Sequence, residues 1–138
     1  MNNTNIRWQQ RFENYEKAYL LLAKAVSIIE PSEIERAGMI QFFEMTFELA
    51  WKLLKDYLEQ EGYMIKSPRQ AIKQAVQAEI IENGHQWLDA LEDRNLTVHT
   101  YHKETALAVE NKIVSVYFPI LTALYDDFNT IIKTWTLG

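Results

Sequence analysis

Apolar residues recur along most of the chain at intervals of three and four, a spacing that places them on one face of an α-helix. The first such run covers residues 5–29, and its apolar positions are Trp8, Phe12, Tyr15, Tyr19, Leu22, Val26 and Ile29. Pro31 follows this run, and proline disfavours helical geometry in the preceding residue and cannot donate the next helical hydrogen bond. The pattern therefore predicts a first helix that packs along its length and ends before Pro31.

The next run, about residues 33–61, predicts a second helix that is apolar around most of its circumference. Ser32 and Glu35 have the spacing of a capping box at its start, and Gly62 suits its end. Its polar positions form one narrow stripe, made of Gln41, Glu44, Glu48, Lys52, Lys55 and Glu59. A helix with so wide an apolar surface needs cover on several sides. It is either a central core helix or one whose second face meets another subunit.

Turn signals divide the middle of the chain into two shorter helices. Ser67–Pro68 supplies an N-cap and a proline at the first helical position of a third helix. This helix is predicted to carry apolar residues as far as Ile80 and to stop at Asn83–Gly84. A short fourth helix follows, with Trp87, Leu88 and Leu91 on one face.

The last helix is predicted to begin near Thr100–Lys103 and to reach about Trp135, with Pro119 kinking it or dividing it in two. The sequence contains no alternating strand pattern, no internal repeat and no low-complexity segment. With 138 residues the chain is long enough for one core and short for two, so residues 1–138 are expected to form a single domain. The predicted fold is an all-α bundle of antiparallel helices.

Composition narrows the class of protein without indicating an activity. Apolar residues make up 48% of the chain and charged residues 24%, which is typical of a soluble globular protein. Cysteine is absent, which excludes disulfides and thiolate chemistry and fits a reducing cytoplasm. The N-terminus MNNTNIRWQQ lacks a signal-peptide pattern, and no apolar run approaches the length of a membrane span. We therefore expect a cytoplasmic protein that does not enter a membrane.

The net charge of −5 argues against a broad electrostatic grip on nucleic acid, because such a grip needs a basic face. Any contact with RNA should be focal or should need a second subunit. The four glycines are isolated, so the chain has no glycine-rich phosphate loop, and it lacks the Gly-Ser and paired aspartates of a nucleotidyltransferase. The adjacent pairs Asp126–Asp127 and Glu92–Asp93 diverge on a helix, and we interpret both as solvated.

The segment EDRNLTVHTYHKET collects most of the candidate chemistry, including two of the three histidines, His99 and His102. Arg94 and His99 would point about 140° apart on a continuous helix, so they converge only if the helix breaks between them. Asn95 and the threonine two positions after it favour such a break. A break would set His99 and Tyr101 at the N-terminus of the last helix, whose N–H groups attract phosphate. Arg94 would add a bidentate phosphate donor and His99 a proton-transfer group.

Two other interpretations of this segment stay open from the residues alone. The acidic neighbours that could neutralise Arg94 are Asp89, Glu92 and Asp93. In that case His99 only caps a helix and titrates in water. The spacing His99-x-x-His102 also suits two zinc ligands, although His85 and nearby carboxylates would have to complete the set. We expect no metal site.

The segment RNLTVH, residues 94–99, is similar to the R-x4-6-H motif of the HEPN superfamily, in which a polar residue such as Asn95 commonly follows the arginine. With Tyr101 the match extends to R-x4-H-x-Y. The segment FFEMTFELAWKLLKDYLEQEG, residues 42–62, resembles the second-helix signature of the nucleotidyltransferase substrate-binding-protein branch. SPRQAIKQA and RNLTVHTYHKETA continue the match in the same order. The resemblance spans about residues 8–130.

The resemblance implies a helical bundle like the substrate-binding domain of kanamycin nucleotidyltransferase, a homodimer, and a separately encoded minimal nucleotidyltransferase as partner. In related toxin–antitoxin pairs the HEPN protein is a metal-independent ribonuclease, and the arginine and histidine of two protomers line a cleft at the dimer axis. The nucleotidyltransferase restrains that toxin by adding AMP to the tyrosine. This sequence departs from the pattern at His102, where Asp or Asn is expected as the helix cap.

Carried over residue by residue, the resemblance assigns Arg94 to binding the scissile phosphate of RNA and stabilising its charge. His99 would activate the attacking 2′-hydroxyl or protonate the leaving oxygen, Asn95 would support both, and Tyr101 would accept AMP. No cofactor is implied. The other function that stays open is a non-catalytic subunit that helps the nucleotidyltransferase to bind its substrate. We expect a homodimer that uses part of the second helix's apolar surface and brings both copies of residues 94–101 together.

Overall fold

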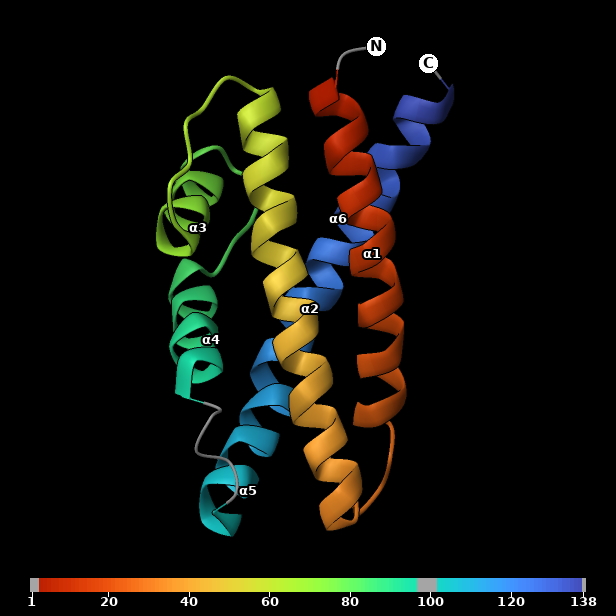
Figure 1. Ribbon diagram of the computed structural model, residues 1–138, viewed down its shortest axis with the longest axis vertical. Helices are drawn as coiled ribbons and strands as arrows, with labels where there is room; N and C mark the ends of the chain where they lie inside the picture. The colour runs from red at the N-terminus through yellow and green to blue at the C-terminus, as the bar shows by residue number, and fades with distance from the viewer. Residues whose placement is uncertain (1–2, 97–101, 138) are drawn as a thin grey trace.

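The computed structural model describes residues 3–96 and 102–137, which form helices joined by short connecting segments (Figure 1). The elements are α1 (Asn3–Val26), α2 (Glu33–Gln60), α3 (Pro68–Gln77), α4 (Gly84–Leu96), α5 (Lys103–Lys112), the π-helix η2 (Ile113–Tyr117) and α6 (Phe118–Leu137). No strand occurs within the described ranges. The predicted all-α bundle is therefore confirmed.

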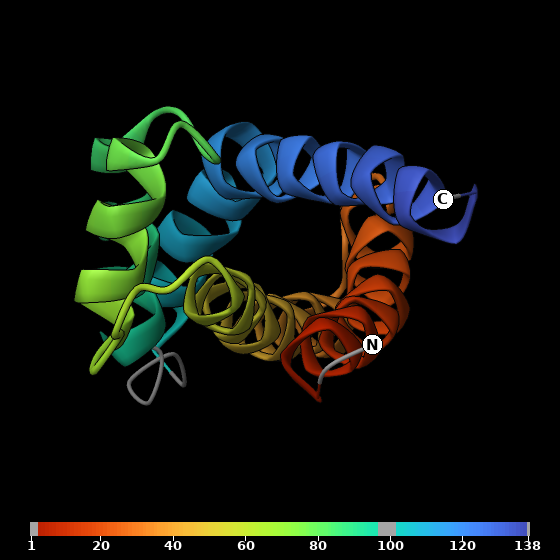
Figure 2. The same cartoon turned by 90° about the horizontal axis from the view of Figure 1, so that it is seen from above.

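Helix α2 occupies the centre of the arrangement. It runs antiparallel to α1, with which it packs most extensively, and it also contacts α3, α4, α5 and α6. Seen from above, α3 and α4 lie on one side of α2 and α1 lies on the other, while α6 extends alongside α1 (Figure 2). The wide apolar surface of α2 is thus covered largely by helices of its own chain, as expected of a central core helix.

The start of α2 follows the predicted capping box. The Ser32 hydroxyl accepts a hydrogen bond from the Glu35 N–H at 3.1 Å, and the Ser32 N–H donates to the Glu35 carboxylate at 2.9 Å. Two large apolar side chains of α2 stay exposed, Ile34 at 85% and Met45 at 41%. The expected use of this helix in a homodimer interface stays a prediction. Ile34 and Met45 are the large apolar side chains of α2 that would be available for such an interface.

Helix α3 is shorter than the sequence predicted. It has the expected Ser67 N-cap and a proline in its first turn, but it ends at Gln77 and does not continue through Ile80. Glu79 adopts a left-handed backbone with φ of 60°, and the N–H groups of Glu79 and Ile80 bond back to the carbonyls of Val76 and Ala75. This is a Schellman ending, in which glycine or asparagine usually takes the left-handed position. Because glutamate occupies it here, the sequence offered no signal for this stop.

The C-terminal helical segment passes Pro119 without being divided. Proline has no N–H to donate and its ring clashes with the carbonyl four residues before it. Directly ahead of Pro119 the helix widens into the π-helix Ile113–Tyr117, where the Phe118 N–H bonds to the Ile113 carbonyl five residues back. Such π-bulges are a known way to interrupt the regular hydrogen-bond ladder inside a helix. Of the two predicted outcomes, a kink or a division, the division does not occur, because the wider turn accommodates the proline, and the kink stays a prediction.

The helix Lys103–Trp135 is 33 residues long and contains a stretch of mean hydropathy 1.3, so by length and composition alone it could cross a membrane. The sequence had led us to expect no such run. The same helix supplies buried Tyr117, Leu121 and Phe128 to the core that it shares with α1 and α2. A core helix of a soluble protein meets the same criterion, so this single helix is weak evidence for a membrane span.

Candidate functional site

Arg94 and Asn95 lie near the end of α4, whereas His99 and Tyr101, assigned to catalysis and modification, do not belong to the described residues. Arg94 lies in the last turn of α4, which stops at Leu96, and the next helix begins at Lys103. Helices α4 and α5 are thus separate elements, whereas a break before His99 and the convergence of Arg94 with His99 stay predictions.

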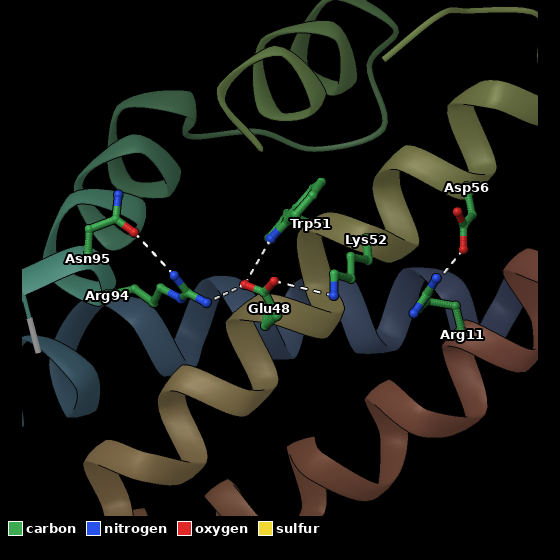
Figure 3. A network of polar contacts seen from close by, with 7 residues as sticks. All are labelled: Arg11, Glu48, Trp51, Lys52, Asp56, Arg94 and Asn95. Carbon is green, nitrogen blue, oxygen red and sulfur yellow. Dashed lines mark hydrogen bonds and ion pairs between the residues drawn. The ribbon is translucent and has the colours of Figure 1, made fainter. Parts of the chain in front are cut away.

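Arg94 is anchored to the central helix. Its Nη2 donates to Glu48 Oε2 of α2 at 2.6 Å, and its Nη1 donates to Asn95 Oδ1 at 3.3 Å (Figure 3). Asn95, predicted to support the site, thus contacts the predicted phosphate-binding residue directly. A guanidinium presents its N–H donors in a planar fork whose geometry suits a phosphate as well as a carboxylate.

Glu48 contacts three other side chains of this network. Besides Arg94, its Oε2 accepts a hydrogen bond from Trp51 Nε1 at 3.1 Å, and its Oε1 lies 3.4 Å from Lys52 Nζ (Figure 3). Two cations therefore share one carboxylate. The side chains of Arg94 and Glu48 are 34% and 31% exposed, so the network is open to solvent and to a ligand.

The sequence did not identify Glu48 as the partner of Arg94. Of the possible acidic partners we had considered only near neighbours such as Asp89, whereas Glu48 is separated from Arg94 by 46 positions. The signal that could have found it was the polar stripe on a helix that is otherwise apolar. A carboxylate on a central helix needs a polar partner or solvent, and the arginine of the neighbouring helix supplies one.

Asp93 is also more than a solvated acid. The buried Tyr117 hydroxyl of η2 donates a hydrogen bond to the Asp93 carboxylate. Burial, with the hydrogen bond and charge of Asp93, raises the pKa of Tyr117 above its ordinary value. The interpretation of Glu92–Asp93 as a solvated pair is wrong for Asp93. The last turn of α4 is thus held from two sides, by α2 through Arg94 and by the π-helix through Asp93.

His102 is the N-cap residue of α5. Its backbone is extended, its carbonyl accepts the Ala106 N–H at 3.0 Å, and its side chain makes no capping hydrogen bond. This fits the departure seen in the sequence, because an imidazole replaces the Asp or Asn that would cap through its side chain. Within the described ranges no three His, Asp or Glu side chains gather as a potential metal site, and His99 of the zinc alternative lies outside them.

An open cavity of about 500 Å³ lies where α2 and α5 face each other. Its lining residues are Glu33, Arg36, Ala37, Ile40, Gln41, Glu44, Lys103 and Ala106. Gln41 and Glu44 belong to the polar stripe that continues to Glu48 one turn later. The polar stripe of α2 therefore faces this cavity at one end and holds Arg94 further along.

Comparison with known proteins identifies relatives over most of the chain. Residues 10–130 match the family described as nucleotidyltransferase substrate binding protein like. Over 92 residues the chain is 32% identical to the probable ribonuclease HepT of Haemophilus influenzae, covering 63% of this chain and 62% of that protein. A crystal structure of a protein from Thermus thermophilus superposes with a TM-score of 0.72 at 34% identity, covering 82% of this chain and 93% of that one. The match thus spans less than two thirds of the length of the Haemophilus relative.

Proposed function

The chain belongs to the family of nucleotidyltransferase substrate-binding-like proteins, a HepT-like branch of the HEPN superfamily, and on this basis we propose that it is a metal-independent endoribonuclease. Arg94 and His99 are its proposed catalytic residues. The relative from Haemophilus influenzae is named as a probable ribonuclease, and this chain carries both residues of the motif at the required spacing. Both findings support the proposal.

The observation that carries the proposal is the anchored guanidinium of Arg94 at the end of α4. Together with Lys52 it places two cations around the single carboxylate of Glu48. The chain as a whole has a net charge of −5, so a broad basic face is not what attracts RNA. Within this network two cations thus exceed one carboxylate in a position that is about a third exposed, which suits the focal phosphate site that such a protein needs.

In the proposed reaction the 2′-hydroxyl of RNA attacks the adjacent phosphorus. His99 removes the hydroxyl proton or delivers a proton to the leaving 5′ oxygen. The O2′–P bond forms as the P–O5′ bond breaks, which leaves a cyclic phosphate and a free 5′-hydroxyl. Arg94 donates N–H groups to the phosphoryl oxygens, whose negative charge rises in the transition state. Asn95 supports the arginine through its side-chain oxygen.

We further propose that a minimal nucleotidyltransferase is the partner and that it transfers AMP from ATP to the Tyr101 hydroxyl, with pyrophosphate as the leaving group. The family description supports a partner of this kind. AMP on a residue two positions from His99 would place a phosphate beside the site and block RNA. Intact-mass measurement of the co-expressed pair should show AMP additions that disappear in Tyr101→Phe. Additions that persist in this variant would remove Tyr101 as the acceptor.

A homodimer is proposed as the active form, with both copies of residues 94–101 close together. Met45 of α2 is 41% exposed and Leu96, beside the turn of Arg94, is 54% exposed, and a dimer would cover such apolar side chains. Light scattering at micromolar concentration should give twice the chain mass of 16.3 kDa. A monodisperse monomer would contradict this proposal.

The second candidate function is a non-catalytic subunit that presents substrate to its nucleotidyltransferase. Two observations favour it, namely the family description as substrate binding and the acidic net charge of the chain. In that case Arg94 would bind a phosphate of the nucleotidyltransferase's substrate, and its loss would abolish nucleotidyl transfer by the partner.

The decisive experiment incubates the purified protein, free of its partner, with RNA in EDTA. The wild type should cleave, and His99→Ala should lose about 10²-fold or more of the rate because it removes the proton-transfer group. Cleavage should also weaken as salt screens the phosphate contacts. Equal cleavage by the wild type and His99→Ala would indicate a contaminant or another site. No cleavage by either would favour the substrate-binding subunit.

A further inference from the structure

Glu48 connects the central helix to the candidate site, although it lies outside the R-x4-H-x-Y segment. Its carboxylate accepts a hydrogen bond from Arg94 Nη2 at 2.6 Å. This bond is the shorter of the two hydrogen bonds described above for this guanidinium. Arg94 comes from α4 and Glu48 from α2, so the contact fixes the arginine relative to the core and not only to its own helix.

The carboxylate of Glu48 is itself held in place by its own helix. Trp51 donates to Oε2 at 3.1 Å from three residues along, and Lys52 lies 3.4 Å from Oε1 from four residues along. Side chains three and four apart are neighbours on a helix, so both contacts restrict the rotamer of Glu48 without help from another element. The acceptor is therefore oriented before Arg94 reaches it.

This ion pair is not what joins α2 to α4. The two helices pack through buried aromatic rings, with the centroids of Phe47 and Trp87 5.9 Å apart. A pair in which both side chains are about a third exposed contributes little to folding. An exposed pair with such restricted geometry is better explained by what it does to the guanidinium.

We propose that Glu48 is a positioning residue, which fixes the Arg94 guanidinium through Nη2 so that the remainder of its fork meets a phosphate in one orientation. The inference rests on the proposed function and adds a residue to it. Lys52 complements Glu48, because its charge offsets the carboxylate and prevents the site from repelling an anion. The polar stripe of α2 thereby serves the site that the neighbouring helix presents.

The chain offers a matched control for Glu48. Glu59 lies on the same stripe, is 26% exposed, and pairs with Lys55 of its own helix at 3.5 Å and with Arg7 of α1 at 4.0 Å. It therefore reproduces the pattern of one lysine within the helix and one arginine from another helix. It differs in its longer contact to the arginine and in lying three turns away from Glu48 along α2.

In the partner-free cleavage assay Glu48→Ala should lower kcat by about 10- to 100-fold, because a displaced guanidinium no longer meets the transition state. KM should change by less than about threefold, and Glu48→Gln should recover most of the rate because its amide oxygen still accepts the Arg94 N–H. Glu59→Ala should cleave like the wild type. Wild-type rates in Glu48→Ala, or an equal loss in Glu59→Ala, would overturn the proposal.

A double substitution tests whether Glu48 acts through Arg94. Glu48→Ala combined with Arg94→Ala should cleave no more slowly than Arg94→Ala alone, since the residue to be positioned is already gone. Multiplied losses would show that Glu48 has an independent role and would contradict positioning.

A third measurement separates this inference from the ribonuclease activity. In ¹⁵N-labelled protein the Arg94 Nε–H signal, assigned by its loss in Arg94→Ala, should report a rigid side chain in the wild type and a mobile one in Glu48→Ala. Glu59→Ala should leave it rigid. If the wild type does not cleave RNA but the signal responds in this way, positioning stands and the proposed function falls. Equal mobility in the wild type and Glu48→Ala overturns positioning even if RNA is cleaved.

Discussion

Among the ion pairs that α2 makes with neighbouring helices, two have sharply different surroundings. Asp56 accepts Arg11 Nε of α1 at 3.0 Å, and Glu48 accepts Arg94 of α4 at 2.6 Å (Figure 3). The side chain of Asp56 is 3% exposed, whereas that of Glu48 is 31% exposed. The first pair is enclosed between packed helices and the second lies open at the end of a helix.

The difference separates a pair that belongs to the scaffold from one that is available to a ligand. A buried carboxylate that loses its partner keeps an uncompensated charge away from water, so its pair is costly to break. An open pair can exchange its partner for solvent or for a phosphate at little cost to the fold. The two pairs should therefore respond in opposite ways to the same kind of substitution.

The largest effect on stability is expected from Arg11→Met, which keeps the aliphatic stem and removes the charge beside Asp56. Removing one partner of a buried pair typically costs about 3–5 kcal/mol, and we expect about 3 kcal/mol because Arg11 itself is partly exposed. Urea unfolding followed by circular dichroism would measure the loss. RNA cleavage at a temperature where the variant is folded should be unchanged. A loss below about 1 kcal/mol, the usual range of an exposed pair, would make the two pairs equivalent.

Arg94→Met is the corresponding change at the open pair. Its free energy of unfolding should shift by less than about 1 kcal/mol, because the pair is a third exposed. Cleavage should fall by about 10²-fold, equivalent to about 2.7 kcal/mol of transition-state stabilisation. Stability and initial rates would be measured on the same preparation. A strongly destabilised Arg94→Met with a normal rate would reverse the assignment of the two pairs.

Local signals in the sequence were sufficient for much of this architecture. The capping box at Ser32 and the proline-led start of α3 both follow from side chains within three residues of the helix ends. The end of α3 could not be predicted, because Glu79 takes a left-handed backbone conformation that a glutamate does not favour. Nor could the π-helix, since Pro119 shows that the ladder must change but not whether the helix bends, divides or widens.

The candidate site was predictable only as far as its chemistry is contiguous in sequence. Arg94, Asn95 and His99 belong to one short motif, and the structure places the first two of them in the last turn of α4. Glu48 and Tyr117 reach the same turn from other helices, and although the polar stripe of α2 marks Glu48 as needing a polar partner, it does not identify Arg94. Contacts between residues far apart in the sequence depend on how the helices pack. Hydrophobic periodicity predicts which face of a helix is packed, but it does not predict which residue that face meets.

Tyr117→Phe tests the second contact to the last turn of α4. It asks whether this contact affects only stability, as expected of the scaffold, or also RNA cleavage, as expected of the site. Removing the hydroxyl deletes a hydrogen bond to the Asp93 carboxylate, and we expect a loss of about 1–2 kcal/mol because Asp93 is half-buried and can rehydrate. Tyr125→Phe is the matched control, since it deletes a tyrosine–carboxylate bond to Glu16 at 2.7 Å far from α4. Cleavage should fall several-fold only in Tyr117→Phe. Equal rates in both variants would assign Tyr117 to the scaffold alone.

The smallest effect on stability is expected at alkaline pH and concerns Tyr125, which belongs to the scaffold. The hydrogen bond to Glu16, followed by burial and the charge of Glu16, raises the pKa of Tyr125 to about 12, against about 10 in an unfolded chain. The folded protein therefore keeps this proton after the unfolded chain has released it, so the contribution of Tyr125 to stability is complete below about pH 10 and declines as pH rises toward about 12. The urea midpoint of unfolding should fall more steeply between about pH 10 and 12 in the wild type than in Tyr125→Phe. Below about pH 9 the difference between the midpoints of the two proteins should be constant. Tyr117, whose pKa is also raised, should contribute a further decline that Tyr125→Phe retains. Parallel profiles for the two proteins would show that the bond to Glu16 does not distinguish the folded from the unfolded tyrosine.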